Sequence, residues 1–336
     1  MTWLERHWHG ITLLGFVLYP LSLLFRLAVA LRRLLYRAGM RPVVKLPVPV
    51  IVVGNITVGG TGKTPLVLWL VNFLRERGMR PGVISRGYGG RATAPQCVTD
   101  ASDPAICGDE PVLLAQRGGV PVWVGADRAA AARALLRAHP ECDVVVSDDG
   151  LQHYRLARDI EIAVIDGARG LGNGLLLPAG PLREPPARLA CVDAVIVNTS
   201  QSAGVGIRAG APPAFAMTLQ SRGFHNLLNP DHRASVEQFL NSRLHAVAGI
   251  GNPQRFFTLL QRLGLTFTAH PFPDHHAFSA RDLAFAGTDF VIMTEKDAVK
   301  CRPFAIEQYW VLRVDAEIDP AFGELILQKM GKTDGS

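Results

Sequence analysis

The chain of 336 residues has few cysteines and little charge. Its five cysteines are scattered and none forms a C-x-x-C pair, which argues against a disulfide framework or a zinc site and is typical of a reducing compartment. Charged residues make up 19% and apolar residues 48%, so the composition indicates a globular protein with ample material for a large core. The sequence contains no internal repeat and no long low-complexity tract.

The net charge of +6 is confined to the N-terminal segment. Residues 1–45 hold seven Lys or Arg and one acid, whereas the remaining residues hold 28 bases and 28 acids. The basic pI of 9.3 therefore describes one segment and does not indicate a nucleic-acid groove in the body of the chain. We expect no nucleic-acid partner.

The same segment carries an apolar stretch. Residues 10–25 are uncharged, but sixteen residues are short for a bilayer span, which needs roughly 20, and Pro20 interrupts the run. Over residues 21–37, helical geometry places Arg26, Arg33 and Arg37 on one face, with leucines on the opposite face. This pattern favours a helix in the interface of an anionic membrane. A core helix of the body and a single span are the alternatives, and a cleaved signal peptide is disfavoured because no convincing cleavage site follows.

A glycine-rich loop follows the first apolar run of the body. Residues 48–53 read as a buried strand, Gly59-Gly60-Thr61-Gly62-Lys63-Thr64 as a loop, and residues 66–77 as a helix. Strand, loop, Lys-Thr and helix in this order are typical of a P-loop, in which backbone amides and Lys63 bind phosphates and Thr64 binds Mg²⁺. The G-x-x-x-x-G-K-S/T template expects glycine where this chain has Thr57, and Gly59 and Gly60 would supply the lost flexibility.

Apolar β-branched runs alternate with helical patterns along the rest of the chain. We predict strands at 82–85, 120–124, 143–147, 160–165, 192–197, 244–248, 290–294 and 309–314, and helices at 110–116, 127–138, 236–241, 254–263 and 280–286. This alternation predicts an α/β fold, a P-loop-type parallel sheet with a second, smaller α/β domain. A Gly/Ala/Pro/Ser-rich stretch at 201–213 is the best linker, so we predict three parts: a membrane-associated helix at 1–45, a P-loop core at 46–200 and a smaller domain at 201–330.

Several acids and bases follow predicted strands. Asp148 and Asp149 end an apolar strand, where P-loop enzymes place an acid that holds Mg²⁺, and Gln152 and His153 come directly after them. Asp109 opens a helix as an N-cap or, with Glu110, as a general base and a metal ligand. Elsewhere, loops hold three further candidates for binding nucleotide or substrate, namely Tyr88, Arg183 and Glu184.

A pair of histidines beside an aspartate, Asp274-His275-His276, is a further candidate. The spacing supplies no third metal ligand, so a histidine paired with a carboxylate is the simpler functional interpretation. A surface loop is the alternative.

Taken in order, these motifs resemble the tetraacyldisaccharide 4′-kinases, the lipid A 4′-kinases of Gram-negative bacteria. The resemblance rests on residues 54–65, 85–88, 108–111, 148–153, 177–184, 274–276 and 294–300, together with the hydrophobic N-terminus. It covers nearly the whole chain, and the Thr57 departure from the general P-loop template is itself a trait of that family.

The resemblance implies an enzyme at the cytoplasmic face of the inner membrane, peripheral or monotopic. It would transfer the γ-phosphate of ATP, with Mg²⁺, to the 4′-hydroxyl of a tetraacylated glucosamine disaccharide 1-phosphate, without an obligate protein partner. By the same resemblance Asp109 is the catalytic base assisted by His275, Glu110, Asp148 and Asp149 are acids of the metal and nucleotide site, and Arg183 and Glu184 lie near nucleotide or substrate. The alternative function is a membrane-docked P-loop NTPase that acts through a protein partner.

Overall fold

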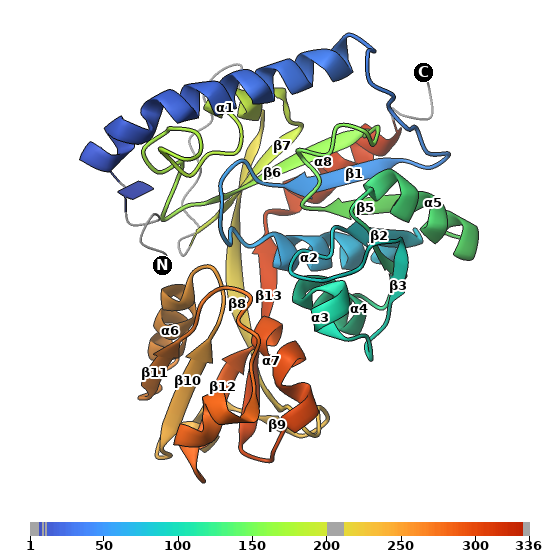
Figure 1. Ribbon diagram of the computed structural model, residues 1–336. Coiled ribbons are helices and arrows are strands. Elements are labelled where there is room, and N and C mark those ends of the chain that lie inside the picture. The colour runs from blue at the N-terminus through green and yellow to red at the C-terminus, as the bar shows by residue number, and fades with distance from the viewer. Residues whose placement is uncertain (1–6, 9, 11, 200–211, 332–336) are drawn as a thin grey trace.

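The structure is a computed structural model that describes residues 7, 8, 10, 12–199 and 212–331 (Figure 1). Its α-helices are α1 (Leu13–Arg37), α2 (Lys63–Glu76), α3 (Pro104–Cys107), α4 (Asp109–Gly118), α5 (Arg128–Ala138), α6 (Pro253–Arg262), α7 (Glu295–Cys301) and α8 (Pro320–Gly331). Its strands are β1 (Val50–Gly54), β2 (Pro81–Ser85), β3 (Gln96–Val98), β4 (Val122–Val124), β5 (Val144–Asp148), β6 (Ile160–Asp166), β7 (Ala194–Asn198), β8 (Ala214–Asn226), β9 (Arg233–Ala234), β10 (Leu244–Ala248), β11 (Thr268–Pro271), β12 (Phe290–Thr294) and β13 (Tyr309–Ile318). The 3₁₀ helices include η2 (Pro186–Cys191), η3 (Val236–Phe239), η4 (Ala280–Ala286) and η5 (Arg302–Phe304).

The thirteen strands form one sheet. Their order is β11-β10-β12-β13-β8-β7-β6-β1-β5-β2-β4-β3, and β9 pairs with β8. Most neighbours run parallel, and the antiparallel pairs are β13 with β8, β8 with β9, and β3 with β4. The predicted α/β fold with a mostly parallel sheet is therefore confirmed.

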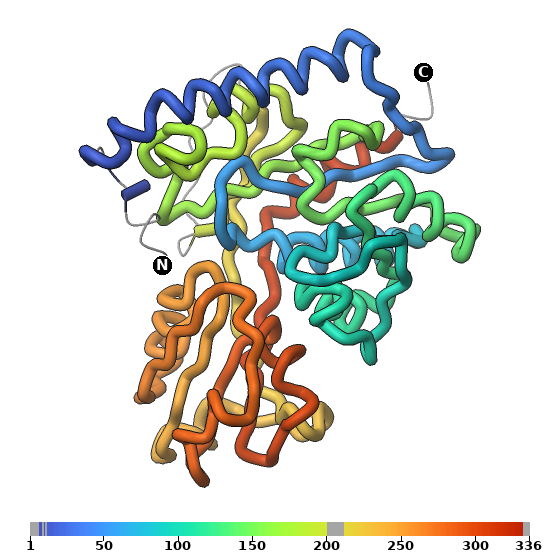
Figure 2. The backbone as a smooth tube through the Cα atoms, in the orientation of Figure 1, coloured from blue at the N-terminus to red at the C-terminus, as the bar shows by residue number. Residues whose placement is uncertain are grey.

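Two lobes share this sheet (Figure 2). One lobe surrounds β1, β2, β5, β6 and β7, and the other surrounds β10, β11 and β12. The long strands β8 and β13 pair along most of their length and run from one lobe into the other. The predicted linker at 201–213 lies almost wholly outside the described residues, and the three-part division of the chain stays a prediction.

Burial of apolar side chains holds in place the two elements that the glycine-rich loop connects, β1 and α2. Every residue of β1 is buried, and α2 buries Leu66, Leu70 and Leu74 completely on one face. Full burial of a leucine side chain contributes about 1.5–3 kcal/mol. The sequence pattern thus anchors both β1 and α2, so that the loop between them is held at the carboxyl edge of the parallel strands.

Some predicted elements differ from the structure. The helices expected at 236–241 and 280–286 are the short 3₁₀ helices η3 and η4. β8, the short strands β3, β9 and β11, and the helices α3, α7 and α8 were not predicted. β8 alternates apolar residues with exposed polar ones and includes Gly223, which weakens a strand pattern.

The N-terminal helix is longer than predicted. α1 continues through Pro20, which removes one backbone hydrogen bond without ending the helix. Its 25 residues span about 37 Å, and it is the one helix among the described residues that is long and apolar enough to cross a membrane. Leu24, Leu27 and Leu31 are exposed, while Ser22 faces the body and donates a hydrogen bond to the backbone oxygen of Leu176. This exposure argues against a core helix.

Candidate functional site

The loop between β1 and α2 has the backbone geometry of an anion-binding loop. Gly59 (φ 98°) and Gly62 (φ 93°) adopt left-handed conformations that would strain any residue with a side chain. Gly62 is the N-cap of α2, and Lys63 is its first residue. The first amide groups of a helix have no partner within the helix, so an anion bound here would accept their hydrogen bonds.

Thr57 does not disturb this geometry. It is 7% exposed, and its backbone forms an antiparallel bridge with Leu182. Among the described residues other than glycine, only Asp149 and His275 have a positive φ, so the position of Thr57 does not require glycine. The left-handed turns fall on Gly59 and Gly62 instead, whereas Gly60 was predicted to share this role with Gly59.

Asp148, the last residue of β5, is completely buried. The Ser85 hydroxyl donates to its Oδ2 at 3.1 Å, while its Oδ1 has no hydrogen-bond partner among the described residues. Burial raises the pKa of Asp148 to about 7, and the neighbouring carboxylates of Glu110 and Asp149 add to the shift. The carboxylate is therefore placed to receive a cation.

Asp149 has the opposite electrostatic environment. Its Oδ1 lies 3.4 Å from the Lys63 ammonium, and its Oδ2 lies 3.2 Å from the Arg183 guanidinium. Burial opposes the charged form, but these two cations outweigh it and lower the pKa of Asp149 to about 2. Its φ of 48° is a strained conformation of the kind that is concentrated at functional sites.

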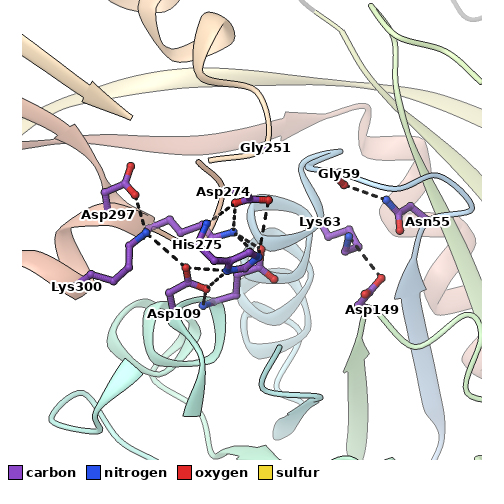
Figure 3. Close-up of polar contacts among 12 residues, drawn as sticks. Asn55, Gly59, Lys63, Asp109, Asp149, Gly251, Asp274, His275, Asp297 and Lys300 are labelled. Atoms are coloured by element: carbon purple, nitrogen blue, oxygen red, sulfur yellow. Dashed lines mark hydrogen bonds and ion pairs between the residues drawn. The ribbon is translucent and has the colours of Figure 1, made fainter. Parts of the chain in front are cut away.

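An aspartate and a histidine meet across the two lobes (Figure 3). His275 Nδ1 lies 3.0 and 3.1 Å from the two carboxylate oxygens of Asp109, which is the first residue of α4 and 4% exposed. Burial alone would raise the pKa of Asp109, but the His275 hydrogen bond and nearby lysines lower it overall. Burial would likewise lower the pKa of His275, and Asp109 raises it overall. His276 instead lies near Asp282, at 3.5 Å.

Two lysines of α7 complete the cluster. Lys296 Nζ lies 3.0 Å from Glu110 Oε1, and Lys300 Nζ lies 2.8 Å from the buried Asp297 and 3.7 Å from Asp109. These contacts join α7 of one lobe to the first turn of α4 in the other. The charges of the acids predicted on α4 are thus balanced by lysines of the other lobe.

Two of the predicted substrate residues lie beside these clusters. Tyr88 is 61% exposed, and its ring centroid lies 5.0 Å from that of His275. Arg183 contacts Asp149, as described above. Both side chains therefore lie next to groups of the predicted site.

The other three predicted substrate residues contact protein groups. Gln152 donates to Glu184 at 2.8 Å and to the backbone oxygen of Asn55 at 3.0 Å. Glu184 is 1% exposed, and His153 lies 3.7 Å from Asp127. Burial and neighbouring arginines lower the pKa of His153 to about 4. These three side chains support the loops around the P-loop, and their predicted contact with substrate stays a prediction.

Sequence reasoning assigned no role to several residues of the site. Asn198, at the end of β7, donates to the backbone oxygen of Thr61 at 2.9 Å, and Asn55 donates to the Thr61 hydroxyl at 3.3 Å. A side chain at Gly251 would clash with the backbone of Gly60, so the opposite lobe touches the P-loop directly. Asn55 follows β1 in the motif and could have been found, whereas Asn198 and Gly251 have no local signal.

The residues present fit Mg²⁺. Among the described residues no three His, Cys, Asp or Glu side chains form a metal-binding group, but Mg²⁺ in phosphoryl-transfer sites usually takes one or two carboxylates and the substrate phosphates. The unpaired Oδ1 of the buried Asp148 is a carboxylate oxygen of this kind. The Thr64 hydroxyl and the carboxylates of Glu110 and Asp149 are the other oxygen donors predicted there.

Comparisons with known proteins converge on one family. The family model described as "Tetraacyldisaccharide-1-P 4'-kinase" matches residues 14–331. The chain is 54% identical to the tetraacyldisaccharide 4′-kinase of Methylobacillus flagellatus, over 98% of this chain and 96% of the relative, and 57% identical to that of Azoarcus sp., over 94% and 91%. A solved structure of LpxK from Aquifex aeolicus in complex with ATP has a TM-score of 0.79 and 28% identity, and the match covers 95% of this chain and all of that one. The chain therefore belongs to the tetraacyldisaccharide-1-P 4′-kinase family.

Proposed function

We propose that the chain is an ATP-dependent lipid kinase of lipid A biosynthesis. It transfers the γ-phosphate of ATP to the 4′-hydroxyl of a tetraacylated glucosamine disaccharide 1-phosphate. The observation that carries this function is the Asp109–His275 pair, in which Asp109 is the first residue of α4 and His275 approaches it from the other lobe. Glu110, the next residue of α4, lies close enough to Asp148 to raise the pKa of that carboxyl. A carboxylate base thus lies near a phosphate-binding loop, as transfer to an alcohol requires.

Asp109 acts as the general base in this proposal. The cations around it lower its pKa, so it is ionised near neutral pH and accepts the proton of the sugar hydroxyl. His275 donates to Asp109, holds the carboxylate in place and stabilises its charge. Tyr88, which packs against the His275 ring and is largely exposed, forms a wall for the sugar.

The P-loop side binds the nucleotide. Lys63 leaves Asp149 and binds the β- and γ-phosphates, while Thr57 and the residues from Gly59 to Thr64 surround the phosphates with backbone amides. Thr64, Asp148 and Glu110 would hold Mg²⁺, with Asp149 beside them, and the metal would neutralise phosphate charge. Arg183, which pairs with Asp149 in the structure, then turns some of its hydrogen-bond donors to a phosphate or sugar oxygen. Gln152, His153 and Glu184 keep the neighbouring loops in place.

A transfer assay tests this function. The protein is incubated with γ-labelled ATP, Mg²⁺ and tetraacyldisaccharide 1-phosphate in detergent micelles, beside Lys63→Ala. We expect label in the lipid fraction with the wild type and loss of that label in the variant. Label released only as inorganic phosphate would contradict the lipid kinase and favour an NTPase that acts through a protein partner.

The exposed apolar face of α1 is proposed to lie in the cytoplasmic leaflet of the inner membrane. Leu24, Leu27 and Leu31 are more than half exposed, and the substrate's acyl chains would remain in the same leaflet. Co-sedimentation with anionic phospholipid vesicles should fall when these three leucines are replaced by serine. Leu228→Ser/Leu240→Ser, which changes exposed leucines of the other lobe, should bind as well as the wild type. Equal binding of both variants would contradict the role of α1.

A further inference from the structure

Asp109, Glu110, His275, Lys296 and Lys300 form the catalytic cluster of the proposed function. A cavity that none of these residues lines is formed in part by the same two helices, α4 and α7. Its volume is about 550 Å³, within the range of small-molecule sites. α4 contributes Arg117 and α7 contributes Glu295, while the paired strands β8 and β13 form another wall. Asp109 and Lys296, on the same helices, belong to the catalytic cluster instead.

Positive charge exceeds negative charge in this cavity. Three acids line it, namely Asp231, Glu295 and Asp315. Five arginines line it, namely Arg117, Arg222, Arg233, Arg302 and Arg313. Guanidinium groups are always charged and bind phosphate oxygens in a bidentate manner, so a cavity of this composition favours an anion.

Arg117 is engaged through both of its terminal nitrogens and joins the two lobes. It contacts both carboxylate oxygens of Glu295, at 2.8 and 2.9 Å, and it also contacts Asp315. Its Nη1 donates to the backbone oxygen of Val314 at 3.0 Å. Two of the three acids are therefore used by this one arginine.

The remaining arginines have unused hydrogen-bonding capacity. Arg222 and Arg313 reach Asp315 only through Nε, at 3.3 and 3.7 Å. Arg233 and Arg302 form no ion pair or hydrogen bond through their side chains with any residue that the structure describes. Four guanidinium groups thus retain donors for a ligand.

The backbone around the cavity is irregular in both strands. The register of β13 against β8 shifts between Leu312 and Val314, which leaves Arg313 at a bulge. On β8, Gly223 has a φ of 87°. Bulges and strand glycines recur where a strand must redirect a side chain or let a ligand approach closely.

The pKa of His225 is lowered by its burial and by this excess of positive charge. This histidine lies on β8 within the cavity wall, and Val311 is its partner on β13. Burial lowers its pKa to about 4, with further contributions from four of the cavity arginines. The ring is therefore neutral near pH 7, and it adds a hydrogen-bonding group without adding charge.

We propose that this cavity binds a small phosphorylated anion with at least two negative charges. The guanidinium groups of Arg233, Arg302 and Arg313 contact its phosphate oxygens. A membrane headgroup is not the ligand, because α1 lies at the top of the molecule and the cavity element β9 lies near the opposite end (Figure 1). The proposal goes beyond the kinase activity and does not depend on it.

Isothermal titration with inorganic pyrophosphate tests the site. The protein is first saturated with Mg²⁺ and a non-hydrolysable ATP analogue so that the P-loop is occupied, and a blank titration into the same buffer corrects for metal binding. The wild type should bind one equivalent, and Arg233→Ala/Arg302→Ala should bind about tenfold more weakly or not at all. Both arginines are exposed, and a thermal melt confirms that the variant is folded.

Two further variants separate this site from general surface charge. Arg233→Lys/Arg302→Lys keeps the charge and should retain intermediate affinity. Arg262→Ala/Arg281→Ala removes two exposed arginines of the same lobe outside the cavity and should bind like the wild type. The proposal is overturned by absence of binding to the wild type, by unchanged binding to the alanine variant of the cavity, or by equal losses in both alanine variants.

Discussion

The helices α4 and α7 contribute to two clusters with different charge balance. In the catalytic cluster, Glu110 is paired with Lys296, and Asp109 has His275 and Lys300 beside it. In the arginine cavity, four guanidinium groups have donors without partners, as described above. Because matched charges fix each other's positions, the first cluster is preorganised, whereas the unmatched arginines of the second keep donors with which they can bind an anion.

The largest difference between the clusters should appear on removal of the base. Asp109→Asn keeps the shape but cannot accept a proton, and we expect kcat to fall about 10³-fold, since general-base catalysis contributes about 10²–10⁴-fold. ATP binding, measured by titration, should be retained. Arg302→Ala in the arginine cavity should leave kcat unchanged. A similar loss in both variants would break the distinction between the two clusters.

The adjacent histidines His275 and His276 allow a test variant and its control to be placed in the same loop. His275 Nδ1 bonds both oxygens of Asp109, whereas His276 lies near Asp282 among aromatic rings. Loss of a hydrogen bond to a charged group costs about 1.5–3 kcal/mol, so His275→Asn should lower kcat about 10- to 100-fold. His276→Asn should retain kcat. Steady-state kinetics at saturating ATP would reveal the reverse order if His276 assists the base.

A smaller effect concerns the pH dependence of the reaction. Lys296 is one of the cations that lower the pKa of Asp109, so Lys296→Gln should raise that pKa. The base must be ionised, and the acidic limb of the kcat/KM profile should therefore move to higher pH in the variant. Lys300 is a poorer choice for this test, because its loss would leave the buried Asp297 without its counter-ion. An unmoved acidic limb would show that Lys296 does not tune Asp109.

Local signals were sufficient for nine of the thirteen strands and for the P-loop. β10 and β12 have the predicted boundaries because short apolar runs between polar turns bury on both faces of a parallel sheet. α7 was not predicted, although β12 directly before it has its predicted bounds. Thr294 accepts a hydrogen bond from the backbone amide of Asp297, which is a capping signal that the sequence does contain.

Contacts between the lobes could not be predicted from local sequence signals. Arg117 and Glu295 are separated by 178 residues, and Thr61 and Asn198 by 137. In both pairs, the local sequence around one residue does not indicate which distant residue it contacts. The Asp109–His275 pair was predicted only because both motifs resemble those of one family, and the arginine cavity had no such guide. It is composed of residues from α4, α7, η5, β8, β9 and β13, and four of these elements, α7, η5, β8 and β9, were not predicted.

The smallest predicted effect is the contribution of His225, in the arginine cavity, to the pH dependence of the free energy of unfolding. The pKa of His225 is lowered to about 4 in the folded protein, against about 6.5 in an unfolded chain. Between these values the unfolded chain binds the extra proton, so this histidine contributes stability above about pH 6.5 that is lost as the pH falls toward 4. Urea unfolding at about pH 7 and about pH 5 should show that His225→Gln loses less stability than the wild type, by on the order of 1 kcal/mol. Pyrophosphate in the cavity should reduce the wild-type loss as well, because it neutralises the arginines that disfavour the protonated ring. Identical losses in wild type and variant would mean that the arginine cavity does not hold His225 neutral.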